Sequence, residues 1–342
     1  MTRKRRRREM TLAAVMIALL VLSAHAAEIP DRPPDPDGKA ADMTLLVDGN
    51  RQKIAVNQRL PLDPCSRFPT LTTLDLQAGQ NITIQFGNEG TDALQLTKHR
   101  QAATKKLPIK GEVFSIKDRT AFLILPEKPQ AGRPIPWVWY APTLPGLPGG
   151  AEKWMFEEFL ENGIAIAGVD VGESYGSPAG RAVYTALHDE LVKKRGLDGQ
   201  ACLLTRSRGG LMLYCWAVEN PDKVKCITGI YPVCNIASYP GLDRACGAYG
   251  LTAEQLKEVL VKHNPIDRLT PLARAKVPIF HIHGDQDQVV PLEANSGLVK
   301  KRYDQLGGEM TLEIVRGQGH NLWAGWFNSQ KLVDFILTNA AR

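Results

Sequence analysis

The sequence contains no cluster of cysteine or histidine residues with the spacing of metal ligands. None of its six cysteines stands in a C-x-x-C pair, and its seven histidines are scattered. Two of them, His281 and His283, lie in one apolar segment, where we expect them to face opposite sides of a sheet and to serve as core residues. The sequence therefore predicts neither a metal site nor a cofactor.

The sequence also lacks the excess of basic residues that a nucleic-acid-binding surface requires. Its net charge of +6 arises from the first nine residues, which contain six basic residues and one acidic residue. The remainder holds 36 basic and 35 acidic residues, so its net charge is only +1. A nucleic acid is therefore excluded as the partner of this protein.

Long apolar runs are absent after the amino terminus. Residues 12–22 form one apolar run, which follows the basic segment and precedes the sequence Ala24-His25-Ala26. This pattern is typical of a secretory signal peptide over residues 1–26. An uncleaved anchor is the alternative, but the run is short for a membrane span. We therefore expect a secreted or periplasmic protein with no stable membrane span after cleavage.

The cysteines allow a disulfide in an exported protein. Cys202 and Cys226 lie in predicted neighbouring strands, where they are expected to be plain core residues. Cys234 and Cys246 flank a predicted loop. We therefore predict that Cys234 and Cys246 form a disulfide.

The first hundred residues differ from the rest in composition and in the pattern of apolar residues. Residues 27–42 are rich in proline and aspartate, as in a linker, and residues 43–108 contain short alternating segments separated by Gly, Asn and Asp. Such segments indicate a small β-rich module of antiparallel strands. The module weakly resembles the β-sandwich modules found beside polysaccharide-active enzymes. It is either a sugar-binding module or a structural spacer, and the lack of an aromatic platform favours the spacer.

Residues 109–342 show strands alternating with helices. Strands are predicted over 136–141, 164–171, 202–205 and 224–230, and helices over 151–162 and 180–194. This alternation predicts an α/β fold with a mostly parallel sheet wrapped by helices. A long insertion between residues 231 and 276, with a helix predicted over 253–262, is expected to form a cap above the site.

Ser207 lies where a short apolar strand meets the predicted helix that begins near Leu211. Gly209 and Gly210 follow it, which allows the backbone to reverse sharply. Strand, turn and helix in this order are the context of a nucleophile elbow. Thr205 stands where the usual G-x-S-x-G motif has its first glycine. A serine that only caps a helix is the alternative interpretation.

An aspartate and a histidine follow two later strands. Asp287 comes after the strand predicted over 277–283, and His320 comes after the strand predicted over 310–315. Strand ends in a parallel sheet meet at one edge, so Ser207, Asp287 and His320 form a candidate catalytic triad. The pattern G-x-x-D-x-x-V-P selects Asp287 over Asp285 as the acid.

These motifs resemble those of the α/β-hydrolase superfamily, most closely its dienelactone hydrolase and prolyl-oligopeptidase-like branch. The resemblance covers about two thirds of the chain and implies an α/β-hydrolase fold, preceded here by the small β-rich module. It also implies an oxyanion hole made by the Arg208 N–H and by a second donor after the strand that ends near Ala141. Thr143 and Leu144 are the candidates for the second donor, and Thr143 is preferred.

Two further residues are candidates for substrate binding. Glu173 follows the strand 164–171 at the same edge of the sheet, and Trp323 follows His320. Glu173 can equally be structural. For Trp323, packing against the last helix is the favoured interpretation.

The resemblance implies a serine hydrolase. We expect a secreted serine esterase that cleaves carboxylic esters of carbohydrates through an acyl-enzyme intermediate, with a small molecule or a polysaccharide ester as its substrate. A prolyl-oligopeptidase-like peptidase and a non-catalytic binding protein on a hydrolase scaffold are the alternatives. The intact Ser, Asp and His argue against the binding protein. The oligomeric state stays open.

Overall fold

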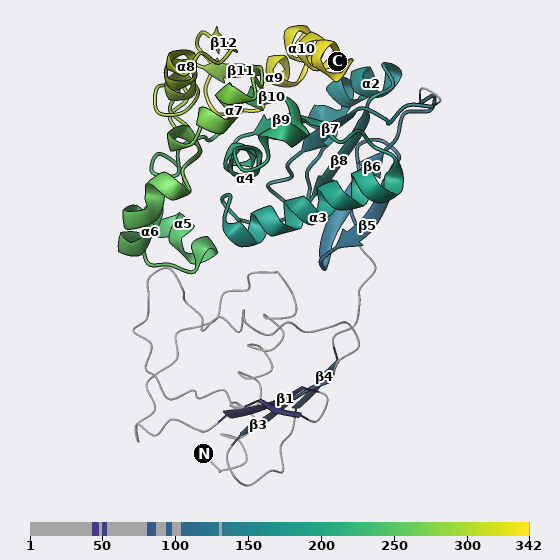
Figure 1. The fold of residues 1–342 in the computed structure, drawn as a ribbon, viewed down its shortest axis with the longest axis vertical. Coiled ribbons are helices and arrows are strands. Elements are labelled where there is room, and N and C mark those ends of the chain that lie inside the picture. The colour runs from purple at the N-terminus through teal and green to yellow at the C-terminus, as the bar shows by residue number, and fades with distance from the viewer. Residues whose placement is uncertain are drawn as a thin grey trace. The chain divides into compact units, whose positions relative to one another are not determined.

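The computed structural model describes strands at residues 43–47, 50–52, 81–86 and 94–97, and residues 104–129 and 132–341 throughout (Figure 1). The chain divides into two compact units, Met1–Gln101 and Ala102–Arg342. The sequence analysis placed this boundary slightly later, between residues 108 and 109. The predicted signal peptide over 1–26 and the linker over 27–42 lie outside the described residues.

The first unit contains a four-stranded sheet in the order β2-β1-β3-β4. The strands are β1 (Met43–Val47), β2 (Asn50–Gln52), β3 (Asn81–Phe86) and β4 (Leu94–Thr97). Every pair in this sheet is antiparallel. The predicted β-rich module therefore contains antiparallel strands where it is described.

The second unit is built on an eight-stranded sheet in the order β12-β11-β10-β9-β7-β8-β6-β5. The strands are β5 (Glu112–Ile116), β6 (Arg119–Ile124), β7 (Trp137–Tyr140), β8 (Ala165–Val169), β9 (Ala201–Arg206), β10 (Val224–Ile230), β11 (Ile279–Gly284) and β12 (Met310–Val315). In this order, every neighbouring pair from β12 through β7 to β8 is parallel. The two pairs at the other end of the sheet, β8 with β6 and β6 with β5, are antiparallel. The predicted mostly parallel sheet is confirmed.

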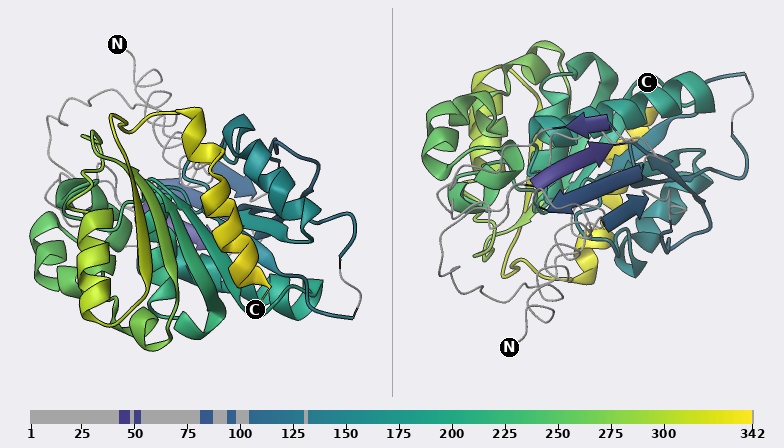
Figure 2. Two further views of the ribbon diagram at one scale, coloured as in Figure 1. Left: turned by 90° about the horizontal axis from the view of Figure 1, so that it is seen from above. Right: turned by 90° about the horizontal axis from the view of Figure 1, so that it is seen from below.

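Helices cover both faces of this sheet (Figure 2). They are α2 (Lys153–Glu161), α3 (Pro178–Arg195), α4 (Gly209–Ala217), α5 (Leu242–Tyr249), α6 (Ala253–Val259), α7 (Thr270–Arg274), α8 (Ser296–Gln305), α9 (Ala324–Phe327) and α10 (Gln330–Ala340). Alternate residues of β7 enter different cores, since Trp139 packs with α3 and α4 whereas Tyr140 packs with α2 and α10. Burial on both faces explains why this strand reads as a continuous apolar run.

The insertion after β10 contains α5 and α6. The helix predicted over 253–262 corresponds to α6, which begins at a capping box in which the Thr252 hydroxyl accepts from the Gln255 N–H at 3.2 Å. The sequence analysis did not predict α5. The Tyr249 hydroxyl at the end of α5 donates to the Tyr175 carbonyl oxygen at 2.8 Å. The insertion is thus tied to the loop that follows β8.

Two sequence predictions about core residues are wrong. Cys234 is a buried free thiol, so the predicted disulfide between Cys234 and Cys246 does not form. His281 and His283 are core residues, but they do not face opposite sides of the sheet, because both ring Nδ1 atoms contact the Ser296 hydroxyl. Residues two apart in a strand share a face, which is the physical reason for the error.

Within the part of the chain that the structure describes, no helix combines the length and apolar character that a membrane crossing requires.

Candidate active site

Ser207 lies at a strained turn between β9 and α4. Its φ of +50° falls in the left-handed region, which residues other than glycine rarely adopt. Its N–H donates to the Ile230 carbonyl oxygen at 3.1 Å. Its carbonyl oxygen accepts from the N–H groups of Gly210 and Val233 at 2.9 and 2.8 Å. Neighbouring backbone therefore holds the strained conformation, as expected of a nucleophile elbow.

The two glycines after Ser207 allow close packing around this turn. A Cβ at position 210 would lie 2.2 Å from the Val233 carbonyl oxygen, which no side chain can tolerate. A Cβ at position 209 would lie 3.2 Å from the Ala141 carbonyl oxygen. The loop after β10 is thus brought against the elbow only because residue 210 has no side chain, and the lack of a side chain at residue 209 eases the close approach of the end of β7.

Thr205 replaces the first glycine of the usual motif without leaving a buried polar group unpaired. Its hydroxyl is fully buried and donates to the Thr228 carbonyl oxygen at 2.9 Å. The Thr228 hydroxyl in turn donates to the Leu203 carbonyl oxygen at 2.9 Å. Both hydroxyls are paired between β9 and β10, so the threonine is accommodated within the sheet.

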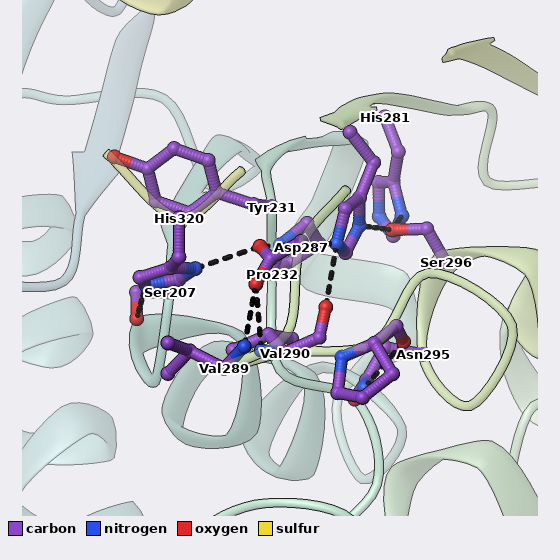
Figure 3. Close-up of polar contacts among 12 residues, drawn as sticks. Ser207, Tyr231, Pro232, His281, Asp287, Val289, Val290, Asn295, Ser296 and His320 are labelled. Atoms are coloured by element: carbon purple, nitrogen blue, oxygen red, sulfur yellow. Dashed lines mark hydrogen bonds and ion pairs between the residues drawn. The ribbon is translucent and has the colours of Figure 1, made fainter. Parts of the chain in front are cut away.

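The structure brings the predicted Ser, His and Asp into one hydrogen-bonded row (Figure 3). The Ser207 Oγ lies 2.9 Å from the His320 Nε2, and the His320 Nδ1 lies 2.8 Å from an oxygen of Asp287. Asp287 is in the loop after β11 and His320 is in the loop after β12. With Asp287 accepting at Nδ1, the neutral imidazole presents a lone pair at Nε2 to the serine hydroxyl.

The Asp287 side chain is fully buried and held at both oxygens. Its Oδ1 accepts from the backbone N–H groups of Val289 and Val290 at 3.0 and 2.8 Å. Its Oδ2 accepts from His320 and lies 3.5 Å from the Nε2 of His283. Burial opposes ionisation of this carboxyl, but the hydrogen bonds from His283 and His320 outweigh it, so the pKa of Asp287 lies well below its ordinary value.

Asp285 has a different role in the same loop. Its Oδ1 accepts from the Gly317 N–H at 2.7 Å, which links the loop after β11 to the loop after β12. This contact gives Asp285 a loop-stabilising role.

Tyr231 is a site residue that the sequence analysis missed. It follows β10 directly, has a φ of +37°, and its ring centroid lies 4.3 Å from that of His320. Its hydroxyl donates to the Asn321 carbonyl oxygen at 3.2 Å, and Trp326 packs edge-on against its ring at 5.4 Å. The Tyr231 ring therefore packs against the imidazole of His320. Its place at the carboxyl end of a central strand was the signal available in the sequence.

The predicted oxyanion and substrate residues lie around Ser207. Arg208 is the N-cap of α4, and Thr143 is buried, with its methyl group 3.5 Å from where a Cβ on Gly209 would lie. The Arg208 guanidinium forms an ion pair with Glu173 at 2.8 Å. The structure therefore places Arg208, Thr143 and Glu173 together at this edge of the sheet. The roles predicted for them stay predictions.

Trp323 lies beyond His320 and remains 42% exposed. Its ring packs edge-on against Trp326 at 5.3 Å, and its backbone N–H donates to the Asn321 Oδ1 at 3.0 Å. One side of the ring thus packs against Trp326 of α9 rather than against the last helix, and the rest stays available to solvent.

A buried ion pair supports the segment that leads into the elbow. Arg206 immediately precedes Ser207 and pairs with Glu152, whose side chain is 1% exposed. Glu152 also accepts from the Tyr140 hydroxyl at 2.8 Å and from the Gly149 N–H at 2.9 Å. The pair therefore connects the end of β9 to the loop after β7. No sequence pattern indicated this contact.

A second serine contacts histidine in the structure. The Ser296 hydroxyl lies 2.9 Å from the Nδ1 of His281 and 2.8 Å from the Nδ1 of His283. All three residues are fully buried, whereas Ser207 and His320 are partly exposed. Only the Ser207 pair can therefore meet a substrate without opening the core.

Among residues 104–129 and 132–341, no group of His, Cys, Asp and Glu side chains is arranged to hold a metal ion.

Comparison with known proteins finds one family whose model matches part of the chain. Residues 184–338 match the prolyl oligopeptidase family of peptidases. No curated protein sequence matches the chain.

Solved structures show the same fold at low identity. The puromycin-hydrolysing peptidase of Mycobacterium tuberculosis is 14% identical with a TM-score of 0.57, covering 76% of this chain and 45% of that one. Est1E from Butyrivibrio proteoclasticus is 18% identical with a TM-score of 0.53, covering 68% of this chain and 99% of that one. A truncated carbohydrate esterase from gut microbiota is 15% identical with a TM-score of 0.50, and the match covers 67% of this chain and 93% of that one.

The chain spans less than half the length of the peptidase and nearly all of Est1E. The elbow at Ser207 and the sheet order agree with these matches, so the chain has the α/β-hydrolase fold, and residues 184–338 resemble the prolyl oligopeptidase family.

Proposed function

We propose that the protein is a serine hydrolase that cleaves carboxylic esters through an acyl-enzyme on Ser207. The observation that carries this proposal is the row of hydrogen bonds from Ser207 through His320 to Asp287, set at a strained and partly exposed turn. A serine that merely capped a helix would need neither the histidine nor the buried carboxylate.

The first half of the reaction acylates the serine. His320 takes the proton of the Ser207 hydroxyl as the oxygen attacks the ester carbonyl. The tetrahedral intermediate collapses, the ester C–O bond breaks, and His320 gives its proton to the departing alcohol. Asp287 keeps the imidazole in the required tautomer and balances its positive charge.

The second half releases the acid. A water molecule gives a proton to His320 and attacks the acyl carbonyl, and the serine oxygen leaves with that proton. The products are one alcohol and one carboxylic acid, and the enzyme returns to its starting state.

The oxyanion formed in both halves needs two donors near Ser207. The Arg208 N–H is one, since Arg208 is the first residue after the nucleophile and stands at the start of α4. The Thr143 N–H is the second, since Thr143 lies against Gly209 in the loop after β7. The guanidinium of Arg208 is held by Glu173, so the two side chains border the site as an ion pair.

The proposed substrates are esters of carbohydrates. The chain matches Est1E and the carbohydrate esterase over nearly their full lengths, which supports an esterase. Export by the predicted signal peptide over 1–26 would bring the enzyme to extracellular or periplasmic polymers. Trp323, which is partly exposed and follows His320 by three residues, offers a surface on which a sugar ring can stack.

A peptidase is the second candidate function, and the match of residues 184–338 to the prolyl oligopeptidase family favours it. An amide nitrogen is a poorer leaving group than an alcohol and depends more on a well-placed proton from His320. The two functions therefore differ in kcat/KM rather than in the residues used.

The test compares kcat/KM of the purified protein for acetylated and glucuronoylated sugars with kcat/KM for chromogenic proline peptides. We expect the sugar esters to be hydrolysed far faster. A clear preference for the peptides would replace the esterase with the peptidase.

A further inference from the structure

Behind Asp287 lies a chain of buried polar side chains that the proposed mechanism does not use. It runs from Tyr214 on α4 through His281 on β11 and Ser296 on α8 to His283. Figure 3 shows His281 and Ser296 of this chain together with Asp287. The three links measure 2.8, 2.9 and 2.8 Å. Tyr214, His281, Ser296 and His283 are fully buried, so their hydrogen bonds are not shared with solvent.

The carbonyl oxygen of Val290 determines where each proton in this chain lies. It sits 2.9 Å from the His283 Nε2, and because a carbonyl oxygen only accepts, that nitrogen carries the hydrogen. In a neutral His283 the Nδ1 is then an acceptor, so the Ser296 hydroxyl donates to it. The Ser296 oxygen accepts from His281 Nδ1–H, and His281 Nε2 accepts from the Tyr214 hydroxyl.

Every hydrogen bond in the chain therefore points toward Asp287. The His283 N–H meets the Val290 carbonyl oxygen and lies 3.5 Å from the Oδ2 of Asp287. The N–H of the same Val290 donates to the Oδ1 of Asp287 at 2.8 Å. His283 thus holds the carbonyl group of the residue whose N–H holds the carboxylate, and its own N–H lies 3.5 Å from the carboxylate oxygen that accepts from His320.

We infer that His283 is a positioning residue for the proposed triad, with Ser296 setting its tautomer so that its Nε2–H secures Val290 and Asp287 in line with His320. Without that hydrogen bond the loop that carries Asp287 loses a side-chain tie to β11. The imidazole of His320 then spends less time in the orientation that accepts the Ser207 proton.

This inference rests on the proposed function and concerns kcat rather than substrate binding. Partners that orient a metal-bound histidine typically contribute about 10- to 100-fold, and we expect an effect of this size for His283. His283 does not reach the substrate side of Ser207, because it is fully buried on β11. Its loss should therefore lower kcat and leave KM nearly unchanged.

The test compares His283→Met with His283→Gln in the full chain, using an ester that the parent protein hydrolyses. The two side chains have similar length and shape, but only the Gln amide can donate to the Val290 carbonyl oxygen in place of Nε2–H. We expect kcat to fall about 10- to 100-fold in His283→Met with KM within about threefold, and to recover to within about fivefold of the parent in His283→Gln. Parent-like kcat in His283→Met, or equal losses in the two variants, would overturn the inference.

Tyr303→Phe is the matched control for loss of a buried hydrogen bond. The Tyr303 hydroxyl is fully buried on α8, as Ser296 is, and donates to the Val277 carbonyl oxygen at 2.6 Å, away from the triad. This variant should keep the parent kcat at temperatures where it is folded. A loss equal to that of His283→Met would show that the effect is general destabilisation and would overturn the inference.

Ser296→Ala keeps the inference testable if His283→Met does not fold. It removes the donor that sets the His283 tautomer, so folded Ser296→Ala should also lose kcat with KM unchanged, and parent-like kcat would overturn the inference.

Ser207→Ala separates the proposed function from the inference about His283. If it retains ester hydrolysis, the proposed function fails, and the inference fails with it. If it abolishes hydrolysis while the His283 and Ser296 variants keep the parent kcat, only the inference fails.

Discussion

Replacing Glu152 by glutamine tests the buried ion pair that supports the elbow. The Oε1 of Glu152 accepts from Arg206 and from the Tyr140 hydroxyl, and its Oε2 accepts from the Gly149 N–H. A glutamine has one acceptor oxygen in place of two and no charge. The Arg206 side chain is 13% exposed, so in Glu152→Gln its positive charge stays buried without a counter-charge.

The expected loss follows from that burial. Removing one partner of a buried ion pair typically destabilises a protein by about 3–5 kcal/mol, because the remaining charge is left unpaired. For a domain of this size, each kcal/mol lowers Tm by about 2–4 °C, so Glu152→Gln should lower Tm by about 6–20 °C.

Tryptophan fluorescence during urea or thermal unfolding measures this loss, since all six tryptophans lie between residues 137 and 326. Glu157→Gln is the matched control five residues away. Glu157 pairs with Lys153 at 3.3 Å on the surface, with side-chain exposures of 46% and 54%, where such a pair contributes about 0–1 kcal/mol. If Glu152→Gln is no more destabilised than Glu157→Gln, the reasoning about the buried pair is refuted.

Three further predictions concern the elbow, the core histidines and the acid. Gly210→Ala places a Cβ 2.2 Å from the Val233 carbonyl oxygen, so it should lower Tm and abolish hydrolysis, and a parent-like protein would contradict this packing. Burial, with a smaller effect of the neighbouring imidazole, lowers the pKa of His281 from 6.5 to about 3. Between pH 3 and 6.5 the unfolded chain therefore binds more protons than the folded protein. As the pH is lowered from 6.5 to 3, the free energy of unfolding should decrease by up to about 1.4 kcal/mol per pH unit. Urea titrations across this range should show a shallower fall in His281→Asn, and an equal slope would reject the assignment. Asp287→Asn should lower kcat by about 10⁴-fold, whereas Asp285→Asn should change it little, and the reverse ranking in steady-state assays would show that the acid was misassigned.

Much of the fold was predictable because its determinants are local. The strand before Ser207, the glycines after it and the strands before Asp287 and His320 can each be recognised within about ten residues of sequence. Parallel strands then bring their carboxyl ends to one edge, so the proximity of these three residues followed from topology. The contacts at Ser207 and His320 have the predicted arrangement, while the catalytic roles of the residues stay predictions.

Contacts between residues far apart in the sequence were not predictable in the same way. Glu152 and Arg206 are 54 positions apart, and neither belongs to a motif that names its partner. The Ser296 hydroxyl between two histidines depends on how α8 docks on β11, which periodicity does not determine. The predicted disulfide from Cys234 failed because spacing alone cannot distinguish a pair from a buried free thiol.

Labelling by a fluorophosphonate probe tests the central claim most directly. The account predicts that the folded parent protein is labelled on Ser207, that Ser207→Ala loses both labelling and ester hydrolysis by on the order of 10⁶-fold in rate, and that Ser296→Ala is still labelled. Undiminished labelling of folded Ser207→Ala, or a label found on Ser296, would contradict it.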